Sequence, residues 1–440
     1  MTTASARHGR KGFEAFADRD FALYWWARMC ASLGTEMMTT TVGWQVYKLT
    51  GQALDLGLIG LAQFAPFGVL FLVTGMVADR VSRTKILSCC IATQALTASG
   101  FLAMTATGHV QLPFIFGLLV LFGVARSFLT PVQQSIVPLL VRSNAFPNAI
   151  AWNNMGGKMS RIVGPAGAGM MIALGDKSGW GEGLVYGTNT VVLATALILT
   201  LFIRTPGQII SKEPVSVSSL LAGLRFIGTR KVLLGATLMD LFGVLFGGAV
   251  ALLPIYAKDI LHVGPEGFGL LRASLMAGAF VSGLTLTRIP VTRNAGVALL
   301  GAAAVFGFAV MVFGVSTWFW LSVVALAVMG AADVVSVFVR HTLAQLITPD
   351  EMRGRVGAAV GVMIGASNEL GEFESGVTAH WWGAVPAVIV GGALTIGVAT
   401  VCALACPALR KVDSLNPDDL VQRYRGPHDR HGRHLEALRG

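Results

Sequence analysis

The sequence is poor in charge and in cysteine for a chain of 440 residues. Asp, Glu, Lys and Arg together make up 13% of it, whereas hydrophobic residues make up 54%. Because so few side chains can be solvated by water, the composition is that of a membrane protein. The cysteines give neither a disulfide framework nor a metal-ligand spacing. All of them fall inside the apolar stretches described below: Cys30, Cys89, Cys90, Cys402 and Cys406.

Features that nucleotide use or catalysis would need are also missing. No G-x-x-x-x-G-K-[ST] segment occurs, since the nearest match, "GGKMS" at 156–160, lacks the first glycine, and this argues against ATP as an energy source. An intramembrane enzyme would need converging His, Ser or carboxylate groups, but His109, His341 and His380 lie near the ends of apolar stretches. We expect no enzyme, no metal and no bound cofactor, with an intramembrane enzyme as a remote alternative.

What the chain has instead is a series of apolar stretches of membrane-spanning length. About 20 apolar residues are needed for a helix to cross a bilayer, and hydropathy divides this chain into about twelve such stretches. The sequence therefore predicts an all-α membrane protein with twelve transmembrane helices. The predicted spans are 21–48, 55–78, 85–106, 112–141, 149–175, 183–203, 232–257, 266–287, 294–315, 317–345, 355–379 and 383–407.

Lys and Arg are distributed unevenly between the two sets of connecting segments. With both termini in the cytoplasm, the outer loops hold only Lys48, Lys177 and Lys258. This asymmetry predicts a bacterial-type cytoplasmic (inner) membrane protein with both termini inside. It also argues against a nucleic-acid partner, since the net charge of +10 is divided among loops. The inner basic residues, besides those of the tails, are Arg80, Arg83, Lys85, Arg142, Arg204, Lys212, Arg225, Arg230, Lys231, Arg288, Arg293, Arg353 and Arg355.

A polar segment, "RTPGQIISKEPVSVSSL" at 204–220, divides the chain into two blocks of six predicted spans. The blocks match each other at nearly one offset, as when "GMVADRVSRTK" at 75–85 is laid over "GLTLTRIPVTR" at 283–293. Such duplication is typical of secondary transporters, so we expect two pseudo-symmetric six-helix bundles. The expected parts are an N-terminal cytosolic tail (1–19), a bundle (20–205), a cytoplasmic linker (206–218), a second bundle (219–409) and a basic cytosolic tail (410–440).

Ionisable residues inside the predicted spans are the first candidates for function, because a charge in hydrocarbon normally faces a cavity or a partner. In the first span, Arg28 and Glu36 belong to a polar stripe at spacings of three or four. Glu36, Asp240 and Arg126 are the first choices for proton coupling. The full set of predicted cavity and coupling residues is Arg28, Glu36, Arg126, Asp240, Asp333 and Arg340.

The segment "GMVADRVSRTK" joins the second and third spans on the cytoplasmic side. Its Gly75, Asp79, Arg80 and Arg83 resemble the G-x-x-x-D-R-x-G-R-R signature of the major facilitator superfamily, although the sequence departs from it at positions 82 and 84. The resemblance implies a latch on the inner side, in which Asp79 faces a helix N-terminus or an arginine. The alternative is topology alone, which would need the basic residues but not Asp79.

The fifth span, with "AWNNMGGKMSRIVGPAGAG", carries small residues around Gly164 and Pro165 and has Gly169 beyond them. It resembles the exporter-associated pattern of the same superfamily, although Ala or Ser replaces most of the family's glycines. Small residues let helices approach closely and proline frees a carbonyl group, so we expect this helix to pack tightly and to bend. Ordinary close packing is the alternative.

Three glutamates interrupt the eleventh span in "ASNELGEFESG" at 366–376. Glu369 and Glu372 are one turn apart on one face, whereas Glu374 points elsewhere. Two carboxylates in a low-dielectric place repel each other, so one of them would hold a proton and act as a coupling site. The alternatives are an ion pair with Arg161 or Lys158, or a position against lipid or water without consequence.

Two more segments, "RDFALYWWAR" at the first span and "DEMRGRVGA" before the eleventh, resemble the superfamily branch that contains the enterobactin exporter and the macrolide efflux proteins. The resemblance covers about residues 18–408. It implies a proton-coupled exporter (antiporter) of a small organic molecule, such as a siderophore or drug, that works by alternating access as a monomer in the lipid bilayer. Arg28, Arg126 and Arg340 favour an anionic or catechol-bearing substrate. A proton-coupled importer and a lysophospholipid transporter remain alternatives.

Overall fold

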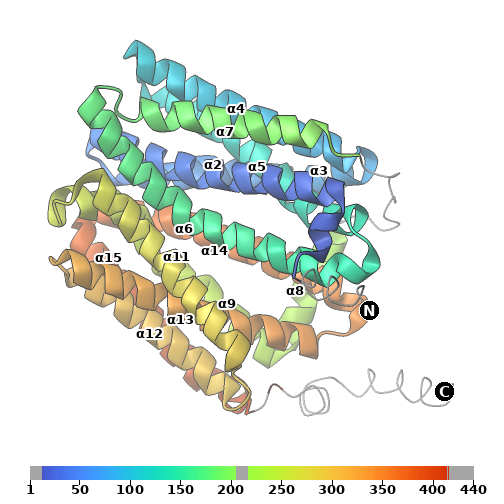
Figure 1. Ribbon diagram of the computed structural model, residues 1–440. Helices are drawn as coiled ribbons and strands as arrows, with labels where there is room; N and C mark the ends of the chain where they lie inside the picture. Colours follow the sequence, from blue (N-terminus) through green and yellow to red (C-terminus); the bar gives the residue numbers. More distant parts are fainter. Residues whose placement is uncertain (1–11, 205–216, 414, 416–440) are drawn as a thin grey trace, which may run out of the picture. The chain divides into compact units, whose positions relative to one another are not determined.

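The computed structural model describes residues 12–204, 217–413 and 415 of the chain. Almost all of the regular structure in these ranges is helical, which confirms the predicted all-α fold class (Figure 1). Most of the predicted N-terminal tail, most of the predicted linker and nearly all of the basic C-terminal tail lie outside the described residues.

The first half of the chain forms six long helices, each within a few residues of a predicted span. Their agreement with the prediction arises because long apolar runs fix where a helix can lie in lipid. Both α2 and α4 end at a glycine, Gly51 and Gly108, with left-handed φ angles of 64° and 70° that glycine adopts without strain. The elements are η1 (Glu14–Ala17), α2 (Arg19–Thr50), α3 (Ala53–Arg80), α4 (Arg83–Thr107), α5 (Leu112–Leu140), η2 (Ser143–Ala145), α6 (Phe146–Ser178) and α7 (Gly183–Leu201).

The second half also has a helical segment at each predicted span. The seventh span consists of several pieces that follow one another over Lys231–Ile260, and α8 before it has no counterpart among the predicted spans. The elements are α8 (Val217–Thr229), α9 (Lys231–Phe246), η3 (Ala249–Leu252), α10 (Leu253–Ile255), the π-helix η4 (Tyr256–Ile260), α11 (Gly264–Arg288), α12 (Ala295–Val315), α13 (Phe319–Ile347), α14 (Asp350–Trp382), α15 (Ala384–Ala405) and α16 (Pro407–Arg410).

Nine helices in the described part of the chain are long and apolar enough to cross a membrane. The long helices outside this set are α2, α6 and α14, and each of them carries several charged residues of the predicted spans. Charge lowers the mean hydropathy of a helix, and a helix of this kind crosses a membrane when its polar face lines a cavity. The number of twelve crossings therefore stays a prediction.

The chain divides into two compact units that differ from a simple division into halves. The first unit is Met1–Val215 together with Leu253–Ala273, and the second unit is Ser216–Leu252 together with Ser274–Gly440. A short segment from the second half of the chain thus belongs to the first unit. As a result, α11 begins in the first unit and ends in the second.

Helix α2 is the central helix of the first unit. It packs against α3, α5, α6 and α7, while α4 packs against α5 and α7, as Figure 1 shows for the blue and green helices. From Thr40 to Tyr47, every residue of α2 is buried. A helix buried on all sides is held by neighbours around its whole circumference, so α2 can present side chains to several helices at once.

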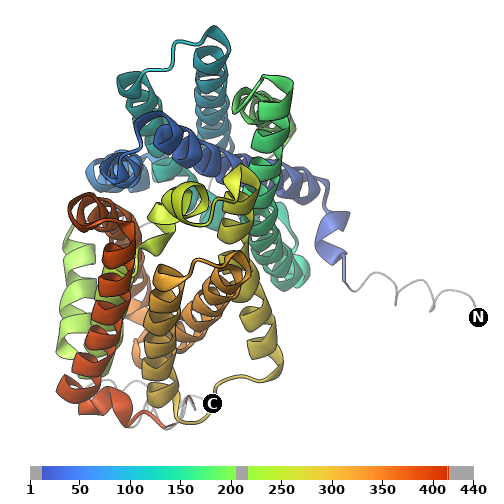
Figure 2. The same ribbon diagram turned by 90° about the vertical axis from the view of Figure 1, so that its left-hand side faces the viewer.

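In the second unit, α12 packs against α13 and α15, and α9 packs against α14 and α15 (Figure 2). The crossing of α12 and α15 depends on two glycines. A Cβ atom added to Gly307 would lie 2.7 Å from the carbonyl oxygen of Gly392, and one added to Gly392 would lie 2.6 Å from that of Gly307. Lipid provides little hydrophobic drive for helix association, so this close backbone packing is what holds such helices together.

Candidate functional site

A cavity of about 450 Å³ lies among α2, α4, α5 and α6 in the first unit. Sites for small organic molecules commonly have volumes of about 300–1,000 Å³. The lining is rich in charge: four cations face one carboxylate. These residues are Arg28 and Glu36 from α2, Arg126 from α5, and Lys158 and Arg161 from α6.

The structure brings together three of the residues that the sequence predicts for a cavity, namely Arg28, Glu36 and Arg126. Lys158 and Arg161 were expected only as partners for the glutamates of the eleventh span, and sequence reasoning missed them as cavity residues. Their spacing of three on one helix could have indicated them, because it puts both side chains on the same face.

Glu36 and Arg161 form a loose ion pair across the cavity, with Oε1 of Glu36 3.7 Å from Nε of Arg161. The Arg161 side chain is 63% exposed and that of Glu36 23% exposed. An ion pair of this length and exposure contributes little to stability. Its two charges are therefore available to another ionic group that enters the cavity.

The predicted glycine at position 164 determines how closely α6 approaches Glu36. A Cβ atom added to Gly164 would lie 2.6 Å from the Cβ atom of Glu36 and 3.5 Å from the carbonyl oxygen of Leu33. Only a residue without a side chain leaves α2 in this position. Because Arg161 is one turn earlier on α6, Gly164 also sets the distance between Glu36 and Arg161.

Three residues that line the cavity have buried polar atoms without a hydrogen-bond partner in the described part of the chain. They are Nε of Arg28, Oε1 of Gln94 and Oδ1 of Asn153. Buried polar atoms are nearly always satisfied, by protein, water or a ligand. The first unit thus offers donors and acceptors to a polar molecule.

Arg126 is held in place from α3. Its Nη1 donates a hydrogen bond of 3.0 Å to Oε1 of Gln63. The two helices are close because Gly123 lies against the backbone of Gln63, where an added Cβ atom would be 2.5 Å from the Gln63 carbonyl oxygen. This contact orients the guanidinium toward the cavity that it lines.

The rest of the predicted fifth-span motif packs against the segment of the first unit that comes from the second half of the chain. An added Cβ atom on Gly269 of α11 would lie 3.0 Å from Cα of Gly169. Pro165 is buried within α6. The expected tight packing is therefore present at both Gly164 and Gly169, whereas the role of this motif in export stays a prediction.

The same segment makes side-chain contacts with α2 that sequence reasoning missed. Tyr47 donates a hydrogen bond to the carboxylate of Asp259, and Nζ of Lys258 lies 5.3 Å from the centre of the Tyr47 ring. The rings of Trp44 and Phe268 stack with centroids 5.7 Å apart. These residues are far apart in sequence, so no local pattern could indicate the contacts.

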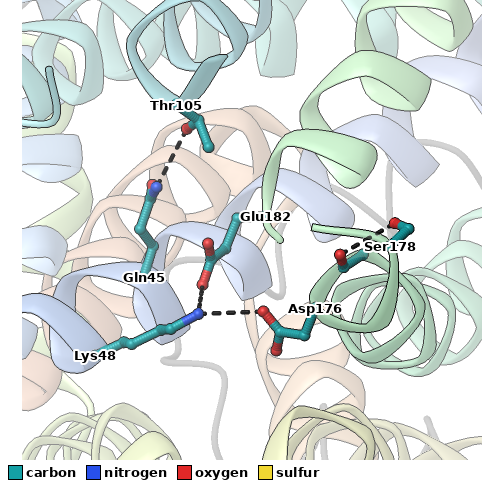
Figure 3. Close-up of polar contacts among 7 residues, drawn as sticks. Gln45, Lys48, Thr105, Asp176, Ser178 and Glu182 are labelled. Atoms are coloured by element: carbon teal, nitrogen blue, oxygen red, sulfur yellow. Dashed lines mark hydrogen bonds and ion pairs between the residues drawn. The ribbon is translucent and has the colours of Figure 1, made fainter. Parts of the chain in front are cut away.

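A second network ties together the ends of α2, α6 and α7 in the first unit (Figure 3). Nζ of Lys48 lies 3.2 Å from Asp176 and 3.0 Å from Glu182. One turn earlier on α2, Gln45 donates to Thr105 at 3.2 Å and accepts from Tyr186 at 2.7 Å. The sequence placed Lys48 in an outer loop without assigning it a partner.

In the second unit, Asp240 of α9 and Arg340 of α13 form an ion pair. Their side chains are 9% and 5% exposed. Both were predicted as cavity residues, but the sequence did not indicate that they pair with each other. Because the pair is withdrawn from solvent, removal of one partner would leave an uncompensated buried charge.

Asp333, two turns before Arg340 on α13, lines a small cavity of about 30 Å³ that Asp240 also lines. The remaining walls come from α12 and α15 and include Phe306 and Thr395. In the described part of the chain, the Asp333 carboxylate has no ion pair and no hydrogen bond. The second unit therefore contains one paired and one unpaired aspartate beside the same small space.

The predicted latch segment forms the junction of α3 and α4. Ser82, which stands where the family favours glycine, caps α4 by accepting a 3.4 Å hydrogen bond from the backbone N–H of Lys85. Arg83 donates a 3.1 Å hydrogen bond to the carbonyl oxygen of Ser135, and Arg80 is exposed. The side chain of Asp79 and the surroundings of Gly75 lie outside the described part of the structure, so the latch stays a prediction.

The predicted acidic cluster lies on α14 in the second unit. Glu369, Glu372 and Glu374 are all partly buried, and the hydroxyl of Ser375 donates a 3.5 Å hydrogen bond to Glu374. Between them, Gly371 packs closely against α9, where an added Cβ atom would lie 2.8 Å from the carbonyl oxygen of Val244. A role of Glu369 and Glu372 in coupling stays a prediction.

Long helices in two units, with ionic residues gathered around cavities inside each unit, define a membrane transporter of the repeated-bundle class. The particular family follows from a family model described as "Transmembrane secretion effector" (MFS_3), which matches residues 11–429. The chain belongs to this family of the major facilitator superfamily, as its motifs predict. It is therefore a transporter of the efflux type and not an enzyme.

Two groups of relatives support the same assignment. The chain is 23% identical to macrolide efflux protein A of Streptococcus pyogenes over 397 residues, which cover 88% of this chain and 96% of that protein. It is 25% identical to the enterobactin exporter EntS of Citrobacter koseri over 327 residues, which cover 73% of each chain.

Solved structures share the fold at low sequence identity. A bacterial homolog of the human lysosomal transporter Spinster, in an inward-facing and occupied conformation, superposes with a TM-score of 0.69 at 15% identity, covering 93% of this chain and 99% of that one. A bacterial homologue of the iron transporter ferroportin, in an inward-facing state, gives a TM-score of 0.64 at 14% identity, covering 87% and 99%. These matches establish the major facilitator fold and nothing about the substrate.

Proposed function

We propose that this protein is a proton-coupled antiporter that exports a small anionic organic molecule by alternating access. Membership of an efflux-type family is the starting point. The charge of the substrate, the use of the proton gradient and the direction of movement are the additional parts of the proposal.

The observation that carries the proposal is the excess of cations in the cavity of the first unit. Arg28, Arg126, Lys158 and Arg161 line it, against the single carboxylate of Glu36. Hydrogen bonds between such cations and an anionic oxygen are about twice as strong as those between neutral groups. A cationic molecule would meet net repulsion there.

The names of the relatives suggest two kinds of substrate, macrolides and enterobactin. Enterobactin bears acidic catechol oxygens, whereas a typical macrolide antibiotic bears a basic amine. The cavity lining therefore favours a catechol-bearing siderophore over a macrolide. Export is supported by these relatives and by the exporter-like motif around Gly164 and Pro165 of α6.

Transport by inverted membrane vesicles tests both the substrate and the direction. We expect enterobactin to accumulate in vesicles whose lumen has been made acidic. In the same assay, erythromycin is the cationic probe and a labelled lysophospholipid is the lipid probe. Accumulation should stop when the pH gradient is collapsed. Loss of preloaded enterobactin under the same gradient would indicate an importer, and movement of the lysophospholipid alone would contradict the proposal.

Charge-neutral variants of the cavity residues test the cationic site, and a variant outside the cavity is the matched control. Arg161→Gln and Lys158→Gln should each weaken enterobactin binding by about tenfold or more, as expected when a charge-assisted hydrogen bond of roughly 1.5–3 kcal/mol is lost. Arg142→Gln removes a cation from the same unit at an exposed ion pair with Asp18, outside the cavity, and should leave binding unchanged. Equal losses in all three variants would contradict a specific cationic site.

A further inference from the structure

The carboxylate of Glu36, which lines the cavity of the first unit, is badly suited to carry a proton that must be exchanged for an anion. Glu36 lies 3.7 Å from Arg161, so its negative charge competes with an anionic substrate for the same guanidinium. A proton on Glu36 would free Arg161 and strengthen anion binding. By linkage, the bound anion would strengthen proton binding by the same factor.

Such mutual strengthening favours movement of proton and anion together in one direction. An antiporter needs the opposite, because the proton and the substrate must occupy the protein in alternate steps. The exchanged proton therefore needs a carboxylate that does not share a cation with the substrate. The second unit offers two aspartates beside one small cavity, Asp240 and Asp333.

Asp240 is unsuitable because its charge is already compensated. It pairs with Arg340, and both side chains are almost completely withdrawn from solvent. A proton on Asp240 would leave the arginine as an uncompensated buried charge, which is strongly unfavourable. The pair is therefore best described as a fixed ionic contact between α9 and α13.

Asp333 has the opposite surroundings. It is partly buried, and in the described part of the chain its carboxylate has neither an ion pair nor a hydrogen bond. An ionised carboxylate in apolar surroundings is costly unless it is compensated. A proton supplies that compensation where no cation does.

The groups that face Asp333 leave the site chemically simple. From α9, Asp240 lines the same cavity, and this aspartate is neutralised by Arg340. From α12 and α15, the lining residues are apolar or, as with Thr395, neutral. The cavity of about 30 Å³ is large enough for a water molecule, which needs about 10–15 Å³, and water can deliver a proton.

We propose that Asp333 is the residue that carries the exchanged proton, while the anion is bound by the cations of the first unit. The inference rests on the proposed antiport for its role in transport. It assigns the two exchanged species to different units. The proton passes from water to a carboxylate oxygen of Asp333 and returns to water, so no other reactant is needed.

Infrared spectroscopy tests the proton site without any substrate. The purified full-length protein is titrated across neutral pH, and the carboxylic C=O band that appears on acidification is compared among variants. We expect Asp333→Asn to lose one component of this band and Glu36→Gln to retain it. Asp333→Glu should retain the component at a shifted frequency, which also shows that the position tolerates substitution.

Two spectroscopic outcomes would overturn the inference. One is an unchanged band in Asp333→Asn, and the other is loss of the component in Glu36→Gln. Gel filtration and thermal unfolding identify any variant that has failed to fold. In that case, the Asp333→Glu band decides, because an unshifted frequency would assign the component to another residue.

A transport measurement separates failure of this inference from failure of the proposed function. With Asp333→Asn, enterobactin should still bind at equilibrium, because the cations of the first unit are intact, while accumulation driven by a pH gradient should be abolished. Undiminished accumulation would overturn the role of Asp333. If no variant moves enterobactin but Asp333→Asn still loses its infrared component, the proton site stands and the proposed substrate is wrong.

Discussion

The cavities of the first and second units use buried charge in opposite ways. In the first unit, about 450 Å³ is surrounded by cations, and Glu36 contacts Arg161 at 3.7 Å. In the second unit, about 30 Å³ lies beside an ion pair that solvent hardly reaches. A loose and exposed pair can exchange partners with a ligand, whereas a tight and buried pair fixes the position of two helices.

A charged residue inside a membrane span can line a cavity or hold two helices together in an ion pair. The sequence alone does not distinguish these two functions. Arg126 of the first unit and Arg340 of the second are both arginines inside apolar helices. Arg126 lines the larger cavity and is oriented by the neutral side chain of Gln63. Arg340 is paired with Asp240. Only the former lines the larger cavity.

The largest expected effect comes from breaking the buried pair. Arg340→Met leaves Asp240 as an uncompensated charge, and the expected loss of stability is about 3–5 kcal/mol. The thermal unfolding midpoint of the purified protein measures this loss. Arg161→Met in the first unit is the matched control, and its loss should be below about 1 kcal/mol because that pair is exposed. Equal losses would remove the contrast between the two units.

An intermediate effect is expected from the close approach of α2 and α6. Gly164→Ala forces Glu36 away from α6, and such overpacking costs about 1–3 kcal/mol. Gly167→Ala is the control one turn away, since a Cβ atom there meets nothing within 4 Å. The variants are compared by unfolding midpoint and by enterobactin affinity. Matching values for both would show that the glycine at 164 does not position Glu36.

The smallest effect is expected at the ionic network drawn in Figure 3. Asp176→Asn removes a half-exposed partner of Lys48, and the expected change in stability is below about 1 kcal/mol. Glu182→Gln should cost more, because the side chain of Glu182 is largely buried. Unfolding midpoints at low and high salt measure both. A larger loss for Asp176→Asn would contradict this ranking.

Much of the fold could be predicted from the sequence because length and apolarity are local properties. The predicted fourth span, 112–141, differs by one residue from α5 (Leu112–Leu140), and the predicted sixth, 183–203, by two from α7 (Gly183–Leu201). The amphipathic α8 was missed, since its apolar face is too short for a membrane span. Local sequence patterns also could not indicate that Leu253–Ala273 belongs to the first unit.

The sequence could predict which residues line the candidate site but not which of them form ion pairs with each other. Spacings of three or four identified Arg28 and Glu36 on one face of the first span, and both line the cavity. The sequence offered Arg161 only as a partner for the glutamates of the eleventh span, whereas the structure pairs it with Glu36. The sequence also put Asp240 ahead of Asp333 for proton coupling, whereas in the structure Asp240 is the one with a cation beside it.

The sequence by itself determined that the chain is a helical membrane protein with ionic groups inside its spans, because hydrocarbon admits only long apolar helices and makes each charge conspicuous. Tertiary structure alone decided which charges neutralise each other and which remain available. The reason is that an ion pair depends on distances of a few ångströms between helices, and those distances are set by small residues such as Gly164 where the helices cross.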